Sequence, residues 1–266
     1  MNIPLRHRQR YVLPVCLLVV FIVSCEEWDP PRRQFADITT GLVAYYPFSG
    51  TGQDVSGNQI HGQFMNGATF GVDRKDNSNS ALFLDGIDDY FLIPDHPKLR
   101  PDVISISLWI KPRVVTSTCH IYNKATYADN TNQQYNAYIR PPYLQPPKSS
   151  GVELVADGSQ DGSCALEQPI QDFVLHYDPV FRMNEWYHFV SVIDRKVGRI
   201  YLNGVEKQVN ANLPDRPIDN CVGGTLRFGM HTGYVTDYNY FDGLMDDIRI
   251  YNRALSEAEI KALYQK

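Results

Sequence analysis

Short apolar runs alternate with clusters of Gly, Asp, Asn and Ser along the chain from Gly41 onward. Runs of this length between turn residues are typical of β-sandwiches and β-barrels. In the run at 104–110, apolar side chains alternate strictly with polar ones, so one face of this strand is expected in a core. The pattern predicts an all-β protein, with strands at residues 42–46, 81–84, 90–93, 104–110, 186–193, 199–202 and 248–251.

Two of the predicted strand pairs have the spacing of β-hairpins. Residues 85–89, rich in Asp and Gly, separate the runs 81–84 and 90–93. Asn203-Gly204 separates the run 199–202 from Val205, and Asn-Gly between strands is a strong hairpin signal. Both connections are therefore expected to be tight turns.

Only the end of the chain has a helical pattern. Ser256 and Glu259 have the spacing of a capping box, and Ile260, Leu263 and Tyr264 form an apolar stripe. This predicts one short helix packed on the sandwich.

Residues 113–182 have the least regular pattern. The polar segment 130–134 and the proline-rich segment 141–147 disfavour central strands. We find no internal repeat and no second core, so one domain is expected.

The N-terminus has the pattern of an export signal. Three arginines up to Arg10 precede an apolar run at 11–23, which is too short to span a bilayer comfortably. A transmembrane anchor is the less favoured alternative. The end of the run, Ile22-Val23-Ser24-Cys25, resembles the bacterial lipobox, and this resemblance implies that Cys25 is lipidated and becomes the first mature residue. The predicted organisation is a lipoprotein signal peptide at 1–24, a lipidated cysteine and tether at 25–40, and a domain at 41–266.

Composition narrows the classes of partner. The chain carries a net charge of −5 and is 43% hydrophobic, so it is acidic and has enough apolar residues for a packed core. An acidic protein lacks the basic surface that nucleic acids require. Glu26, Glu27 and Asp29 resemble the acidic tract that directs some lipoproteins to the cell surface. We expect an exported protein anchored by lipid in the outer membrane or at the cell surface, touching the membrane only through its anchor.

Three cysteines remain once Cys16 and Cys25 are assigned to the signal and the lipid: Cys119, Cys164 and Cys221. In an oxidising compartment they permit one disulfide and leave one thiol. Cys164 and Cys221 lie in loops rich in Gly, Asp and Asn, so this pairing is favoured, while the other two pairings stay open. Their spacing does not fit a zinc site.

Several segments together resemble a known domain family. They are Tyr46-x-Phe48, Asp54-x-Ser56-Gly57-Asn58, Leu84-Asp85-Gly86-x-Asp88-Asp89-Tyr90, the run 105–112, Trp186-x-His188 and, most specifically, 241–256. From about Gly41 to Gln265 the chain resembles the LamG-like (laminin G type 3) domain of the concanavalin A-like lectin/glucanase superfamily. The resemblance implies a jelly roll of two curved antiparallel sheets. Fold alone does not assign an activity.

The resemblance also implies one structural calcium ion. In this family the ion is commonly held by the loop that contains Asp54, Ser56 and Asn58 and by an Asp near the last strand, which matches Asp246 or Asp247. Hard oxygen ligands at alternating positions suit calcium. The alternative is that these residues only form turns.

Other residues of the motif have structural interpretations. Trp109 and Trp186 are expected in the core rather than stacked on a sugar. His188 is expected to be a packing residue, and we identify no Ser, Cys or carboxylate partner for it in the sequence.

The favoured function is a non-catalytic module for carbohydrate binding or adhesion. Sugars are recognised by aromatic rings together with planar polar groups, and two clusters of tyrosines with amide and hydroxyl residues offer both. Candidate ligand residues are Tyr234, Tyr238 and Tyr240 in the first cluster, and Tyr127 and Tyr143 in the second. The second cluster also contains Asn130, Tyr135 and Tyr138. A structural lipoprotein that binds an extracellular protein remains an alternative.

A glycoside hydrolase or polysaccharide lyase of the same superfamily is the other alternative. Hydrolysis needs two carboxylates at a fixed separation. The E-x-D-x-x-E motif of glucanases with this fold is absent, and Glu153, Asp157 and Glu167 do not have its pattern. The adjacent pairs Asp88-Asp89 and Asp246-Asp247 would point to opposite faces of an extended strand. We therefore expect no catalytic activity.

Overall fold

The computed structural model describes residues 36–126, 133–141, 151–156, 173–177, 181–213, 215, 217–231 and 238–266, with only the backbone at 133, 173, 174, 238 and 239. Ala36–Lys266 forms one compact unit. The predicted signal peptide, Cys25, Tyr127, Tyr143, Cys164 and Tyr234 lie outside the described residues, and the side chain of Tyr238 is not described.

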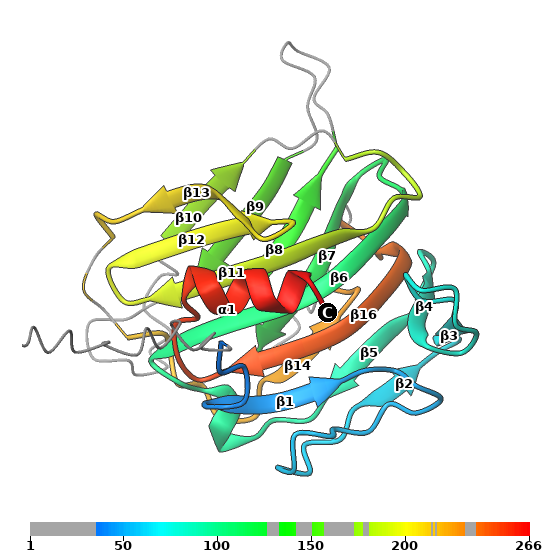
Figure 1. Ribbon diagram of the computed structural model, residues 1–266, viewed down its shortest axis with the longest axis horizontal. Helices are drawn as coiled ribbons and strands as arrows, with labels where there is room; N and C mark the ends of the chain where they lie inside the picture. Colours follow the sequence, from blue (N-terminus) through cyan, green and yellow to red (C-terminus); the bar gives the residue numbers. More distant parts are fainter. Residues whose placement is uncertain are drawn as a thin grey trace, which may run out of the picture. The chain divides into compact units, whose positions relative to one another are not determined.

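Two β-sheets face each other and form a jelly-roll sandwich (Figure 1). Sheet A has the strand order β13-β12-β11-β6-β16-β4-β3, with β1 beside β16. Its strands are β13 (Val205–Asn210), β12 (Val197–Leu202), β11 (Tyr187–Asp194), β6 (Val103–Val114), β16 (Asp242–Tyr251), β4 (Ala81–Asp85), β3 (Thr69–Gly71) and β1 (Leu42–Tyr46).

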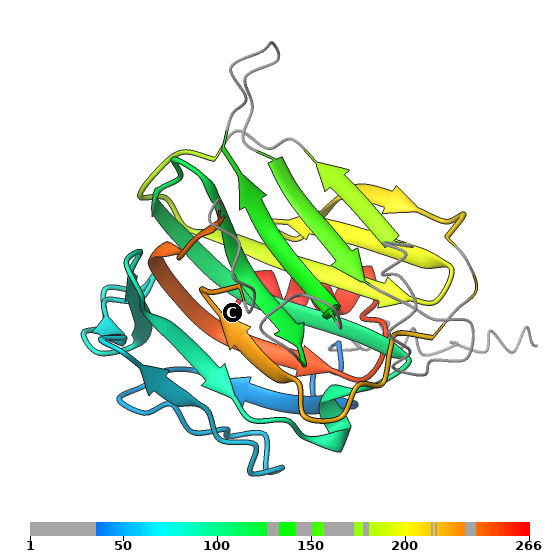
Figure 2. The same ribbon diagram turned by 180° about the vertical axis from the view of Figure 1, so that it is seen from behind.

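Sheet B has the strand order β10-β9-β8-β7-β14-β5-β2 and is nearer to the viewer in Figure 2. Its strands are β10 (Phe173–Tyr177), β9 (Gly151–Ala156), β8 (Gln133–Arg140), β7 (Thr118–Ala125), β14 (Thr225–Phe228), β5 (Tyr90–Ile93) and β2 (Gln63–Met65). The two-residue strand β15 (Tyr238–Asn239) runs parallel to β7, and the other paired strands are antiparallel. The predicted fold class is confirmed.

The main core fills the space between the sheets. The alternation predicted for residues 104–110 places Ile104, Ile106, Leu108 and Ile110 in this core. At one end, the rings of Tyr46, Phe48 and Phe91 are fully buried and meet in edge-to-face contacts. Burial of apolar area on this scale is the main force that holds the two sheets together.

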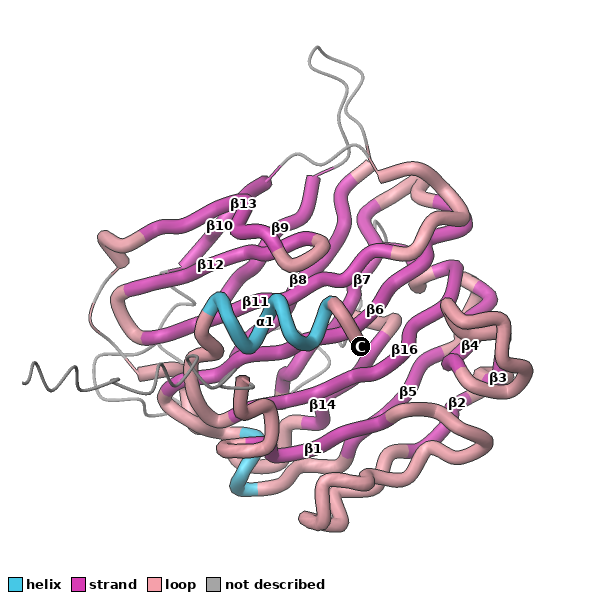
Figure 3. The backbone as a smooth tube through the Cα atoms, viewed as in Figure 1, coloured by secondary structure: helices cyan, strands magenta, loops and turns pink. Residues whose placement is uncertain are grey.

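The helix α1 (Glu257–Tyr264) lies on the outer face of sheet A (Figures 1 and 3). Ser256 and Glu259 form the predicted capping box, and Ile260 and Leu263 are buried in a second, smaller cluster with Val190, Val192 and Tyr251. A short 3-10 helix, η1 (Pro97–Leu99), follows β5. No helix in the described part of the chain is long and apolar enough to cross a membrane.

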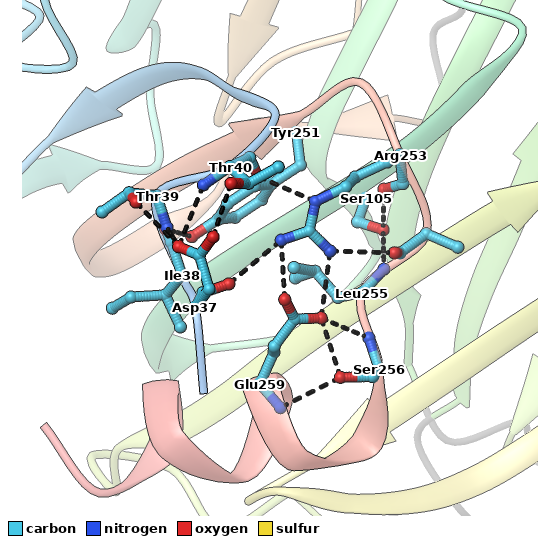
Figure 4. Close-up of polar contacts among 11 residues, drawn as sticks. Asp37, Ile38, Thr39, Thr40, Ser105, Tyr251, Arg253, Leu255, Ser256 and Glu259 are labelled. Atoms are coloured by element: carbon cyan, nitrogen blue, oxygen red, sulfur yellow. Dashed lines mark hydrogen bonds and ion pairs between the residues drawn. The ribbon is translucent and has the colours of Figure 1, made fainter. Parts of the chain in front are cut away.

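Hydrogen bonds hold the first described residues beside α1. The guanidinium of Arg253 donates to the carbonyl oxygens of Asp37 and Thr40, and the hydroxyl of Tyr251 donates to the carbonyl of Ile38 (Figure 4). The described compact unit therefore begins at Ala36, a few residues before the predicted boundary at residue 41.

Two predictions about connections have opposite outcomes. Asn203 and Gly204 have φ of 53° and 75° and join β12 to β13, as expected for a tight hairpin. The hairpin predicted at 85–89 is wrong, because β4 pairs with β3 and β16 in sheet A while β5 pairs with β14 and β2 in sheet B. The Asp-rich loop is instead a crossover between the two sheets.

Residues 113–182, the least regular region of the sequence, contain four strands of sheet B. Gln133 and Gln134, within the segment interpreted as polar and irregular, begin β8, which pairs with β7 on one side and β9 on the other. The interpretation failed because β8 buries polar side chains on one face and apolar ones on the other. Those buried polar side chains are the first indication of a site.

Candidate functional site

The face of sheet B that points away from sheet A carries a row of polar side chains across three adjacent strands. Arg227 on β14 lies opposite Asn123 on β7, and Asn123 lies opposite Asn136 on β8. Residues opposite each other in a sheet point to the same face. Leu226 and Phe228, the neighbours of Arg227 along β14, point into the core. We call Arg227, Asn123 and Asn136 the amide row.

A second row crosses the same face. His120 on β7, Tyr138 on β8, Glu153 on β9 and His176 on β10 lie opposite one another in register. We call these four residues the glutamate row. The strands place the two rows side by side, since Asn136 and Tyr138 are two positions apart on β8.

The Glu153 carboxylate is buried and has three polar partners. The Tyr138 hydroxyl donates to Oε2, Arg140 forms a 2.7 Å ion pair with the same oxygen, and His176 Nδ1 lies 3.2 Å from Oε1. Burial and the hydrogen bond to Glu153 raise the pKa of Tyr138. The side chains of Arg140 and His176 are 33% and 41% exposed, so the network reaches the surface at this end. The Glu153 carboxylate is thus held by contacts from the two neighbouring strands, β8 and β10.

At its β7 end, the glutamate row is in contact with another histidine, His231. The rings of His120 and His231 are 4.4 Å apart, and His120 lies 5.1 Å from the Tyr138 ring. Burial, together with the neighbouring His231, lowers the pKa of His120 well below its usual value. A neutral imidazole offers one hydrogen-bond donor and one acceptor.

The amide row contains polar groups whose hydrogen-bonding capacity is unused. Asn136 is fully buried, and neither its Oδ1 nor its Nδ2 has a partner among the described residues. The Nε of Arg227 is likewise buried and has no partner in the described part of the chain. A buried donor or acceptor without a partner costs about 1–3 kcal/mol. Such groups require a specific explanation, and a bound ligand is one.

Aromatic side chains border the amide row at Arg227. The guanidinium lies 5.8 Å from the centre of the Tyr90 ring, and Tyr240 is close enough to interact electrostatically with both. Tyr90 and Tyr240 are half-buried, so their rings are partly open to solvent. Of the five tyrosines predicted to bind ligand, Tyr240 is the one whose side chain is described, and it lies beside this row.

Most residues of this face were not found from the sequence. The available signal was the alternation of polar and apolar residues within 118–125 and 133–140, which is a strand pattern. It was hidden by the adjoining polar and proline-rich segments. The cross-strand register that joins Arg227 to Asn136 has no signal in the sequence.

A family comparison agrees with the sandwich described above. The profile Laminin_G_3, described as the concanavalin A-like lectin/glucanases superfamily, matches residues 85–261, which is more than half of the chain. The chain belongs to this superfamily. No curated protein sequence matches it.

Solved structures with the same fold include carbohydrate-bound domains. Domain 4 of AbnA, a GH43 extracellular arabinanase from Geobacillus stearothermophilus solved with arabinotriose, matches this laminin G-like chain with a TM-score of 0.56 at 22% identity, over 84% of this chain and 98% of that one. The botulinum neurotoxin serotype D ligand-binding domain, solved with N-acetylneuraminic acid, matches with a TM-score of 0.60 at 16% identity, over 85% and 51%.

The binding domain of Paraclostridial Mosquitocidal Protein 1 matches with a TM-score of 0.61 at 14% identity, over 86% of this chain and 52% of that one. The chain thus spans about half the length of the two toxin domains. At these identities the likeness shows the fold alone.

The calcium ligands implied by the superfamily do not form one set of ligands in this laminin G-like chain. Both carboxylate oxygens of Asp54 accept hydrogen bonds from its own loop or from β1, from the backbone N–H groups of Tyr45, Ser56 and Ile60 and the Ser56 hydroxyl. The Asn58 Nδ2 donates to the carbonyls of Leu42 and Val43. These residues organise the turn, which is the alternative that the sequence left open.

Asp246 and Asp247 are neutralised by arginine. Arg74 forms ion pairs of 2.8 Å with Asp246 and 2.7 Å with Asp247, and Arg249 lies 3.1 Å from Asp247. A guanidinium therefore occupies the position where a cation would bind these carboxylates. The present donors do not fit a calcium ion, and calcium binding stays a prediction of the sequence.

The carboxylates of Asp246 and Asp247 point the same way, contrary to the expectation that adjacent residues of an extended strand face opposite sides. Asp247 has a φ of 51°, and the register between β16 and β6 shifts between Asp246 and Arg249. This bulge turns both carboxylates toward Arg74, so they do not point to opposite faces. Bulges have this effect because they add a residue on one strand.

His188 has a partner that was not identified from the sequence. Its Nε2 lies 2.9 Å from the Ser107 hydroxyl, two positions from Trp109 on β6. Trp109 and His188 are buried on the outer face of sheet A, where Trp109 stacks on Tyr264 at the end of α1. Trp109 is therefore buried under the helix and not between the sheets, whereas Trp186 is half-buried.

Two of the three remaining cysteines lie within the described residues. Cys119 is a buried free cysteine on β7, and Cys221 is buried. Burial raises the pKa of the Cys119 thiol to about 12, so it is unreactive as a nucleophile. The pairing of Cys164 with Cys221 stays a prediction.

Proposed function

We propose that this domain binds carbohydrate on the outer face of sheet B. The observation that carries the proposal is the fully buried Asn136, whose amide has no partner in the described structure although it lies in register with Asn123 and Arg227. The unused groups of Asn136 and Arg227, which share this face, are suited to a ligand that has many hydroxyl groups.

The chemistry of the face matches a sugar. An amide side chain donates and accepts at once, as do neighbouring sugar hydroxyls. Tyr90 and Tyr240 supply partly exposed rings for the apolar faces of a sugar. The binding of arabinotriose and of N-acetylneuraminic acid by domains of the same fold supports the proposal.

We propose binding without hydrolysis. Glu153 is the only Asp or Glu in the strands of sheet B, and Tyr138, Arg140 and His176 surround it. Val155 takes the next position along β9 on the same face, where a second carboxylate would stand in a glucanase-like strand. A glycoside hydrolase requires two carboxyl groups across the scissile bond.

We also propose that lipidation of Cys25 displays the domain at the cell envelope. The last residues of the predicted tether, 37–40, are held by hydrogen bonds beside α1 on sheet A, and the proposed ligand face belongs to sheet B. The described chain therefore begins on a different sheet from the one that carries the proposed ligand face. C25S is expected to abolish lipid labelling and membrane retention, and retention of both would contradict the lipobox.

The carbohydrate proposal is tested with a glycan array probed by the purified chain and by N136L. Leucine has about the volume of asparagine but no hydrogen-bonding groups. We expect the chain to bind a defined set of glycans in competition with free sugar, and N136L to lose that binding. The control V192A changes a buried apolar residue in the cluster under α1 on sheet A, and should leave glycan binding unchanged. Silence of the folded chain across a broad array would overturn the proposal, and so would binding that N136L retains in full.

A further inference from the structure

We propose that Arg227 binds a carboxylate, so that the ligand is a glycan containing an acidic sugar of the uronic or sialic acid class. This inference rests on the proposed function and adds the chemical class of the ligand.

Arg227 is the only arginine of the described residues without an ion pair. The other described arginines each lie within 4.0 Å of an Asp or Glu oxygen: Arg74, Arg100, Arg113, Arg140, Arg182, Arg195, Arg199, Arg249 and Arg253. Several of these are largely exposed, whereas Arg227 is half-buried. An exposed cation needs no partner, but a partly desolvated one is stabilised by an anion.

The surroundings of Arg227 leave its guanidinium available to a ligand. Its Nε has no partner within the described residues, and the group lies over the Tyr90 ring, 5.8 Å from its centre. Tyr240, which lies between β15 and β16, interacts with the same charge. A guanidinium on an aromatic ring keeps its edge free, and that edge matches the two oxygens of a carboxylate.

The rest of the face indicates one acidic group among neutral sugars. Asn123 and Asn136 continue the row from Arg227 and are uncharged, while Arg140 is already paired with Glu153. The exposed Asp88 interacts electrostatically with Tyr240, and this negative charge disfavours a dense polyanion. One unpaired cation beside neutral amides suits a glycan with an isolated carboxylate.

The experiment compares matched acidic and neutral ligands by isothermal titration of the full chain. The probes are 3′-sialyllactose against lactose, and trigalacturonic acid against galactotriose. We expect at least one acidic probe to bind roughly 10-fold or more tightly than its neutral partner, as for a hydrogen bond to a charged group. This preference should shrink as salt is raised from about 50 to about 500 mM, because salt screens the charge.

Three variants test whether the Arg227 guanidinium causes the preference for acidic ligands. R227Q removes the charge and is expected to abolish the preference, and R227K keeps the charge but loses the planar fork, so an intermediate preference is expected. R182Q makes the same change in net charge at an arginine whose side chain is 76% exposed, and should leave the preference intact.

Two failures are distinguishable. Equal binding of acidic and neutral probes, or a preference that R227Q retains, would overturn the acidic ligand and leave carbohydrate binding in place. Absence of binding to every glycan, on a broad array as well as in these titrations, would overturn both proposals.

Discussion

The guanidinium of Arg253 forms two hydrogen bonds, of 3.0 and 2.7 Å, with the carboxylate of Glu259 across the turn that leads into α1 (Figure 4). The same guanidinium donates to the carbonyls of Asp37 and Thr40. Glu259 in turn accepts from the backbone N–H of Ser256 at the start of the helix. One arginine thus joins the first described residues, the last strand and the helix.

Removal of this arginine is expected to loosen both ends of the domain. R253Q loses the paired hydrogen bonds to Glu259, and we expect the free energy of unfolding to fall by about 2 kcal/mol in urea denaturation. R253K keeps the charge but cannot reach all the acceptors, so a smaller loss is expected. Equal stability of R253Q and the unmodified chain would show that the contacts contribute nothing.

Arg74 is expected to take the place of a metal ion between Asp246 and Asp247. R74A leaves two buried carboxylates with fewer cations, and we expect a loss of about 3 kcal/mol in the free energy of unfolding. Calcium should raise the melting temperature of R74A but not that of the unmodified chain.

Thermal scans with calcium and with excess chelator check this expectation, and R74K is the control because it keeps the charge. A fall in the melting temperature of the unmodified chain on chelation would support the calcium site that the sequence predicts. It would contradict the role assigned to Arg74.

Acid is expected to destabilise the domain through His188. Burial, with Arg249 and Arg74 nearby, lowers the pKa of this imidazole from 6.5 to about 3. Between these values the unfolded chain binds a proton that the folded chain does not, so the free energy of unfolding falls as the pH is lowered from about 6.5 toward 3. The contribution is at most about 5 kcal/mol.

Urea denaturation at several pH values measures this slope. H188Q should have a shallower slope but not a flat one, because His120 titrates in the same direction. S107A removes the hydrogen bond to His188 without removing the titrating group, so it should lower stability and keep the slope. An unchanged slope in H188Q would contradict the assignment.

Asn136 is expected to cost stability in the free protein. N136L removes a buried amide without partners, and we expect it to raise the free energy of unfolding by about 1 kcal/mol or more. N58L is the matched control, since the Asn58 amide donates to Leu42 and Val43 and its loss should be destabilising. A drop in the melting temperature of N136L as large as that of N58L would indicate a purely structural role.

The sequence by itself determined the strands with regular alternation, the Asn203-Gly204 hairpin and the capped helix. These features depend on residues close together in the chain: alternation fixes which side of a strand is apolar, and a cap or a tight turn needs only a few neighbouring residues. The motif around β16 also indicated the superfamily. None of these signals required knowledge of which strands pair.

The tertiary structure decided everything that depends on pairing between distant strands. It sent β4 and β5 to different sheets, although the loop between them has the composition of a turn. It placed Arg74 on Asp246 and Asp247, residues separated by more than half the chain, and it aligned Arg227 with Asn123 and Asn136. A local pattern states which face a side chain takes but not what lies opposite it, and the proposed ligand site consists of such opposite residues.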